Sequence, residues 1–346
     1  MKLLLENWRG FLNEGGNIFA GQTASIPREF IHPTLERYYL ELKRLFPLKR
    51  KSFGAFRPIG SVGKKEMSGD IDLAANASEL FPGGEVTAEE LKKWNIDPND
   101  WQVTFDIFRK RARSRADSEI GWRAFLSELA KYINDNSDMI MVNLENIGPG
   151  IMFSLFPQFD SKGEQQDIGV QIDWMIGNRD WLEFAYYSDP PSKDDEFLKG
   201  LHRTQLMLAM FFTKGISYNH SVGLKDRKTK KLITNEPSEV VRLLGSIYGG
   251  RMGRETTNNF HSLHNWLKSN ASTEEYDDAI GKYLKILDRT KGVSVRDNRT
   301  GETKGCGYIP KELEDIWIDR QEELGLTGKF LCRDTNETLW KISQRR

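Results

Sequence analysis

Residues 59–73 read Ile-Gly-Ser-Val-Gly-Lys-Lys-Glu-Met-Ser-Gly-Asp-Ile-Asp-Leu, and this stretch decides the predicted fold. It ends by alternating Asp70 and Asp72 with Ile71 and Leu73, a pattern typical of a strand with one buried face. Residues two apart leave the same face of a strand, so both carboxylates point away from the core. Two such anions about 4 Å apart repel by roughly 4 kcal/mol at an effective dielectric of about 20, and a divalent cation removes that cost. A half-buried strand with two aspartates on its polar face has the same pattern, so the pair alone leaves both interpretations open.

A predicted turn at Gly60 and Ser61 precedes the two aspartates. It follows a short strand within 53–59 and opens a loop over 62–69. Glycine lets the backbone approach a phosphate group, while exposed amides, the serine hydroxyl and Lys64 or Lys65 donate to phosphate oxygens. The turn therefore favours a phosphate-bearing ligand next to the carboxylates.

A second strand, predicted over 168–176, carries a third carboxylate. Its apolar residues occupy every second position: Val170, Ile172, Trp174 and Ile176. Asp173 emerges from the opposite, polar face. Asp167 shares that parity but lies about 20 Å further along an extended strand, so only one of the two meets the first pair, and we choose Asp173. Asp173 follows Asp72 by 101 residues, which indicates inserted helical material at about 84–146.

The order strand, Gly-Ser, eight intervening residues, Asp-Ile-Asp and a hydrophobic residue resembles the signature of the DNA polymerase β nucleotidyltransferase superfamily. That superfamily includes poly(A) polymerases, CCA-adding enzymes, terminal uridylyltransferases, aminoglycoside nucleotidyltransferases and cyclic-dinucleotide synthases. The resemblance covers about 55–73 and 168–176. Because the segment Glu-Gly-Gly-Asn-Ile-Phe at 14–19 is unlike the better known members, the resemblance implies a divergent, viral or phage branch.

The resemblance implies transfer of a nucleoside monophosphate from an NTP to an acceptor hydroxyl, with release of pyrophosphate. Two Mg²⁺ or Mn²⁺ ions would be bound by Asp70, Asp72 and Asp173, and the terminal phosphates by Gly60, Ser61, Lys64 and Lys65. The expected acceptor is an RNA 3′ end, of tRNA or another RNA. A protein, a small molecule or a second nucleotide would use the same chemistry. The alternative of another class is a non-catalytic module of the same fold that binds nucleic acid or protein.

Two basic clusters favour an RNA partner. The chain has 50 Lys+Arg and 50 Asp+Glu, so its net charge is zero and any attraction to a polyanion must be local. Residues 43–65 contain eight basic and no acidic residues, and 109–115 contain five basic residues. We predict RNA contact through both segments; solvated helix faces are the alternative.

The predicted fold is α+β. Residues 1–190 form a nucleotidyltransferase domain, a short mixed sheet with flanking helices, and the break at Pro190 and Pro191 precedes a mainly helical domain over 191–346 that binds acceptor or nucleotide. The active site is expected in the cleft between them. In the first domain we predict helices over 33–46, with Pro33 in the first turn, and 117–132, and a hairpin of 151–156 with 168–176. In the second we predict helices over 194–214, 236–248, 257–269, 273–289 and 310–324, and hairpins over 222–234 and 293–308.

The cellular compartment is predicted from what the sequence does not contain. Two cysteines, Cys306 and Cys332, have no CxxC or Cys/His surroundings, which argues against a disulfide framework and a zinc site. The longest apolar run, 206–212, is far short of the roughly 20 residues of a membrane span, and the first residues do not resemble a secretory signal. We expect a cytoplasmic protein, in the host cytoplasm if it is viral, with no membrane partner.

Overall fold

The computed structural model is an α+β protein with two compact units. Among the described residues, the first unit holds 17–187 and 220–222, and the second holds the rest. The predicted boundary at Pro190 and Pro191 lies outside the described residues. No described helix is both long and apolar enough to cross a bilayer. The described residues are 17–19, 21–46, 56–82, 84–112, 116–187, 200–289, 295–296, 303–304, 309–327, 330, 332, 335 and 337–345.

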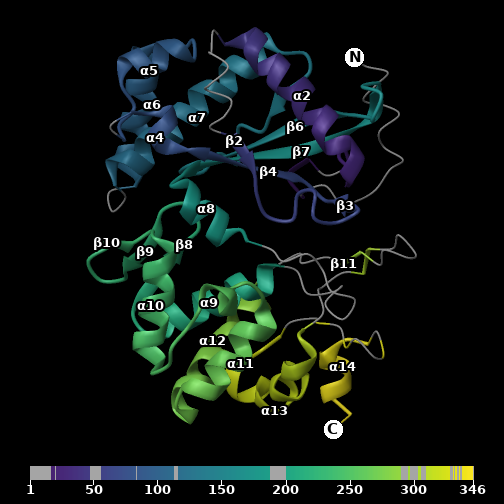
Figure 1. The fold of residues 1–346 in the computed structure, drawn as a ribbon, viewed down its shortest axis with the longest axis vertical. Coiled ribbons are helices and arrows are strands. Elements are labelled where there is room, and N and C mark those ends of the chain that lie inside the picture. Colours follow the sequence, from purple (N-terminus) through teal and green to yellow (C-terminus); the bar gives the residue numbers. More distant parts are fainter. Residues whose placement is uncertain are drawn as a thin grey trace. The chain divides into compact units, whose positions relative to one another are not determined.

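A five-stranded mixed sheet organises the first unit (Figure 1). Its strands, in spatial order, are β2 (Phe56–Pro58), β4 (Ile71–Asn76), β7 (Gln165–Gly177), β6 (Ile151–Phe159) and β5 (Met141–Val142). β4 and β7 run parallel, whereas the other neighbours are antiparallel. Because parallel neighbours need a crossover connection, the long separation of Asp72 from Asp173 follows from this topology.

The predicted hairpin of β6 and β7 is confirmed, but its strands are longer than expected. The expected loop over 157–167 is reduced to 160–164. There the Asp160 carboxylate accepts hydrogen bonds from the backbone N–H groups of Lys162 and Glu164, each 2.9 Å long. Gly163 has φ +79°, a conformation that glycine adopts without strain. This local capping lets the strands continue almost to the turn.

Helices cover one face of the sheet (Figure 1). The core contains side chains of α2 (Arg28–Leu45), α5 (Ala88–Lys93) and α7 (Asp117–Asn136). The ring centroid of Trp94 lies 5.6 Å from that of Phe125 and 6.1 Å from that of Trp174. Burial of each such ring contributes on the order of 1.5–3 kcal/mol. Side chains of α5 and α7, within the stretch 84–146 that is predicted as an insertion, therefore belong to the core of this unit.

Two further helices of the crossover complete this layer. α4 (Ala77–Leu80) follows β4 directly, and α6 (Pro98–Arg111) packs beside α7. The indole N–H of Trp101 on α6 donates to the carbonyl of Gly121 at 3.2 Å. α6 buries none of its residues fully, so it is the outermost helix of the group.

The predicted start of the helix over 33–46 is wrong. α2 begins at Arg28, so Pro33 lies inside it instead of in its first turn. The start is set by tertiary pairing: β1 (Ile26–Pro27) pairs with β3 (Met67–Ser68), and the Arg28 N–H donates to the Glu66 carbonyl at 2.9 Å. Pro33 removes one helical hydrogen bond, but the helix continues because its apolar face is buried.

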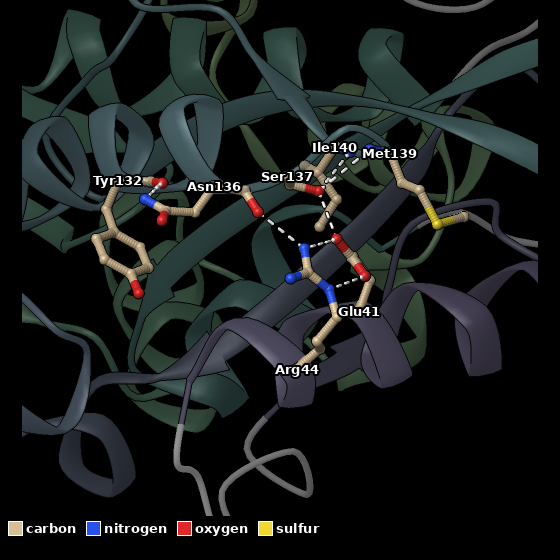
Figure 2. A network of polar contacts seen from close by, with 7 residues as sticks. All are labelled: Glu41, Arg44, Tyr132, Asn136, Ser137, Met139 and Ile140. Carbon is tan, nitrogen blue, oxygen red and sulfur yellow. Dashed lines mark hydrogen bonds and ion pairs between the residues drawn. The ribbon is translucent and has the colours of Figure 1, made fainter.

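A polar network joins the end of α2 to the connection between α7 and β5 (Figure 2). The buried Glu41 carboxylate accepts hydrogen bonds from the Arg44 guanidinium at 2.6 and 2.9 Å, and from the Ser137 hydroxyl at 2.6 Å. The same Ser137 oxygen accepts from the backbone N–H groups of Met139 and Ile140. The hydrogen bonds from Arg44 lower the pKa of Glu41, although burial acts in the opposite direction.

The second unit is mainly helical, as predicted. α9 (Gly200–Thr213) lies at its centre, with α11 (Phe260–Asn270) and α12 (Thr273–Arg289) packed against it. The predicted helix ranges agree with these bounds within a few residues where the structure describes them. The remaining helices are α10 (Pro237–Tyr248), α13 (Glu314–Leu324) and α14 (Leu339–Ser343).

The hairpin predicted over 222–234 is confirmed, and a third strand extends it to a three-stranded antiparallel sheet. Its order is β10 (Leu232–Thr234), β9 (Gly223–Asp226) and β8 (Ile216–Asn219). β8 follows α9 after a two-residue turn. This strand was not predicted from the sequence. The second predicted hairpin, 293–308, contains β11 (Val295–Arg296) paired with β12 (Thr303–Lys304), and its other residues lie outside the described residues.

We predict that Glu41→Gln lowers the free energy of unfolding by about 1 kcal/mol at pH 7, because it replaces charge-assisted hydrogen bonds with weaker ones. The pKa of Glu41 is lower in the folded than in the unfolded state. Its contribution is therefore present above the unfolded carboxyl pKa of about 4.3 and is lost as the pH falls below it. Urea denaturation at pH 7 and pH 3 measures both effects. Glu36→Gln, at an exposed position of the same helix, is the control. Equal losses for the two variants would contradict the structural role of Glu41.

Candidate metal centre

The pairing of β4 with β7 brings two carboxylates together. In the parallel register, Asp72 lies directly opposite Asp173, between the pairs Ile71–Ile172 and Leu73–Trp174. The isoleucines, Leu73 and Trp174 face the helices, so the aspartates leave the other face. Trp174 also donates its indole N–H to the Tyr38 hydroxyl at 2.8 Å. This buried hydrogen bond and the packing of the Trp174 ring fix the part of β7 that carries Asp173.

Asp70, two residues before Asp72, completes a group of three. One carboxylate oxygen from each of Asp70, Asp72 and Asp173 lies within 4.8 Å of the others. Asp173 is only 5% exposed, and the other two are half-buried. All the ligand atoms are hard anionic oxygens, the type that Mg²⁺, Mn²⁺ and Ca²⁺ prefer. The structure thus brings together the three carboxylates that the sequence pattern selected.

The electrostatics of this group match a site for cations. Burial, together with the negative charges of Asp70 and Asp173, raises the pKa of Asp72 well above its usual range. Burial and the charge of Asp70 do the same to the pKa of Asp173. A carboxylate held near like charges is destabilised in its ionised form, and a bound cation reverses that effect.

Gln171 is a residue of this site that the sequence interpretation missed. Its side-chain amide donates to both carboxylate oxygens of Asp173, at 2.8 and 3.0 Å. Gln171 lies two residues before Asp173 and therefore on the same face of β7. These two hydrogen bonds fix the orientation of the Asp173 carboxylate and lower its pKa, opposing the effect of burial. In the sequence, the signal for this role was a polar amide side chain two positions before Asp173, on the same face of the predicted strand.

The Gly60 turn packs directly against Asp72. The Ile59 N–H donates to the Asp72 carbonyl at 2.9 Å, and Gly60 then takes φ +68°. A β-carbon added to Gly60 would lie 2.8 Å from an Asp72 carboxylate oxygen, closer than such atoms approach. A second turn follows, in which the Lys64 N–H donates to the Ser61 carbonyl at 3.1 Å and Gly63 has φ +70°. Gly60 is thus required both by its conformation and by its contact.

The remaining predicted ligand-binding residues lie on these turns. Ser61, Lys64 and Lys65 are half-buried. The Lys64 ammonium lies 4.6 Å from the centroid of the Tyr187 ring, a cation–π contact. Tyr187 follows α8 (Arg179–Ala185), whose Leu182 packs with Ile59, Ala74 and Met175 on the aspartate face of the sheet. α8 therefore covers one part of that face (Figure 1), and the carboxylates leave the sheet from another part of it.

The two basic clusters predicted to contact RNA are partly committed to internal contacts. Arg44 pairs with Glu41, and Arg109 pairs with Asp117 at 2.9 Å. Arg57 lies 3.9 Å from Glu183. Lys49, Arg50, Lys51, Arg113 and Arg115 lie outside the described residues. Arg44, Arg57 and Arg109 therefore make contacts within the protein that the sequence did not indicate.

A scan against protein-family models gives no match, and no curated protein is significantly similar to the chain. Function is therefore inferred from the geometry of the site.

We predict that Gly60→Ala destabilises the protein more than Gly63→Ala. Both substitutions place a β-carbon on a backbone with positive φ, at a cost of about 1–2 kcal/mol. The Gly63 position has no heavy atom within 4 Å of the added carbon, whereas the Gly60 position meets the Asp72 carboxylate. Urea denaturation of the two variants isolates that contact. Equal destabilisation would show that the close approach of Gly60 to Asp72 has no energetic consequence.

Proposed function

We propose that this chain is a metal-dependent nucleotidyltransferase, which moves a nucleoside monophosphate from an NTP to an acceptor hydroxyl and releases pyrophosphate. One observation carries the proposal: the parallel register places Asp72 opposite Asp173, with Asp70 beside them and a glycine turn against Asp72. A complete set of carboxylates favours an enzyme over a binding module. In a binding module, three mutually repelling acids would only destabilise the fold. A nucleotidyltransferase fold for the first unit is part of this proposal.

The donor set fits two Mg²⁺ or Mn²⁺ ions, because it offers three carboxylates and no nitrogen or sulfur ligand among the described residues. Asp70 and Asp72 would hold both ions, and Asp173 would hold one. Bound there, the ions would neutralise the triphosphate and lower the pKa of the acceptor hydroxyl.

The side chains have separate roles in this proposal. Asp173, the most buried carboxylate, accepts a hydrogen bond from the acceptor hydroxyl, in an orientation set by Gln171. The backbone N–H groups of the Gly60 turn and the Ser61 hydroxyl donate to phosphate oxygens. Lys64 and Lys65 add positive charge beside them. Transfer is direct, without a covalent intermediate on the protein.

An RNA 3′ end is the acceptor that we propose. The site would treat a hydroxyl of a protein, a small molecule or a second nucleotide in the same way, so the acceptor must be decided by contacts outside it. The local concentrations of basic residues at 43–65 and 109–115 favour a polyanion.

The experiment is incubation of the chain with each α-labelled NTP, Mg²⁺ or Mn²⁺, and a mixture of tRNA and oligoribonucleotides. We expect label in RNA, and a loss of at least about 100-fold for Asp72→Asn, equivalent to about 3 kcal/mol of transition-state stabilisation. Asp167→Asn is the matched control, since it makes the same change at an exposed position of β7. Equal transfer by the Asp72 variant would refute the site. Absence of transfer by the unmodified chain to any RNA in the mixture would refute an RNA acceptor, and absence of transfer to an added protein mixture or to a second nucleotide as well would refute the activity.

A further inference from the structure

Two cations of the second unit share one aromatic ring. The Arg227 guanidinium carbon lies 3.6 Å from the centroid of the Phe212 ring, and the Lys282 ammonium lies 3.5 Å from the same centroid. These residues come from the end of α9, the turn after β9, and α12. Arg227 also donates to the Phe212 carbonyl at 3.4 Å. Three separate elements therefore converge to hold two like charges against one side chain.

α12 extends this group of charges. Lys285 and Arg289 follow Lys282 at spacings of three and four residues, so all three lie on one side of the helix. The stretch from Lys282 to Arg289 is about 10 Å long at 1.5 Å per residue. We call Phe212, Arg227, Lys282, Lys285 and Arg289 the Phe212 surface.

The cations of the Phe212 surface have no ion-pair partner within the part of the chain that the structure describes. Among the described residues, no carboxylate lies within ion-pair distance of Arg227, Lys282, Lys285 or Arg289. Glu323, whose pKa is lowered mainly by Arg320 and to a smaller extent by the charge of Lys285, is paired with Arg320 at 3.0 Å. Burial and the charges of Arg289, Arg227 and Lys285 lower the pKa of Lys282, as expected where like charges gather.

The turn after β9 adds further exposed positive charge. Lys228, Lys230 and Lys231 follow Arg227 and are exposed. The turn is well organised, because the Asp226 carboxylate accepts hydrogen bonds from the backbone N–H groups of Lys228 and Thr229 at 2.9 and 2.6 Å. The single charge of Asp226 is outnumbered by those of Arg227, Lys228, Lys230 and Lys231.

We infer that the Phe212 surface binds a nucleic-acid strand through its phosphates. Evenly repeated anions along a strand match cations spread over α12 and an adjacent turn, whereas a single phosphate would engage only part of them. A protein partner is disfavoured, because protein interfaces have cores depleted in charge, and here cations contact the aromatic ring. The inference rests on charges of the second unit alone and is independent of the three aspartates.

The test is binding of a fluorescein-labelled single-stranded 20-nucleotide RNA to the full chain in EDTA, followed by anisotropy at several salt concentrations. We expect the double variant Arg227→Gln/Lys282→Gln to bind about tenfold more weakly, and its salt slope to fall by about two. Lys268→Gln/Lys341→Gln removes the same charge from exposed positions of the same unit and should change affinity less than twofold. Phe212→Leu keeps every charge but removes the ring, and should weaken binding several-fold.

Urea denaturation of each variant separates loss of binding from loss of folding. Equal weakening by both double variants would overturn the inference, since net charge alone would explain it. The inference would also be overturned if the Arg227→Gln/Lys282→Gln variant bound RNA as tightly as the unmodified chain. The same holds if polyglutamate displaced the labelled RNA as effectively as unlabelled RNA does. Binding is measured in EDTA, where metal-dependent nucleotidyl transfer cannot occur, so failure of this surface and failure of nucleotidyl transfer are distinguishable.

Discussion

Parallel pairing of β4 with β7 is the constraint on which the candidate site depends. It places Asp72 opposite Asp173, with Asp70 beside them, in partial burial where like charges are costly. A fold that needed only stability would not retain three acids there, because charge without compensation opposes folding. In the proposed function, bound cations would offset the repulsion among these three carboxylates.

The rest of the first unit holds this unfavourable arrangement in place. On the opposite face of β7, Trp174 packs with Trp94 and hydrogen-bonds to Tyr38. Parallel strands need a crossover connection, and here that connection contains α5 and α7. The same two helices bury the apolar face of β4 and β7. On the aspartate face, Gln171 orients Asp173, and Gly60 allows the turn to approach Asp72. Apolar packing on one face of the sheet thus offsets the repulsion between the carboxylates on the other face.

Local patterns predicted the parts of this site but not their assembly. The alternation around Asp72 and Asp173 has a period of two, so it indicated which face each aspartate occupies. It carried no information on which strands pair, and the register that places Asp72 opposite Asp173 depends on that pairing. Pro33 misled the helix prediction because the start of α2 is set by pairing with Glu66. The Phe212 surface joins residues some 70 positions apart, and only the folded second unit brings them together.

The stability of the chain in the absence and presence of metal tests the central claim most directly. Because the folded-state pKa of Asp72 is raised, its ionisation opposes folding above the unfolded carboxyl pKa of about 3.9 and has no effect well below it. In EDTA at pH 7, Asp72→Asn should be more stable than the unmodified chain by on the order of 1 kcal/mol, and the difference should shrink towards pH 3. Mn²⁺ should stabilise the unmodified chain and not the variant. A less stable variant in EDTA, together with no stabilisation of the unmodified chain by Mn²⁺, would contradict the account.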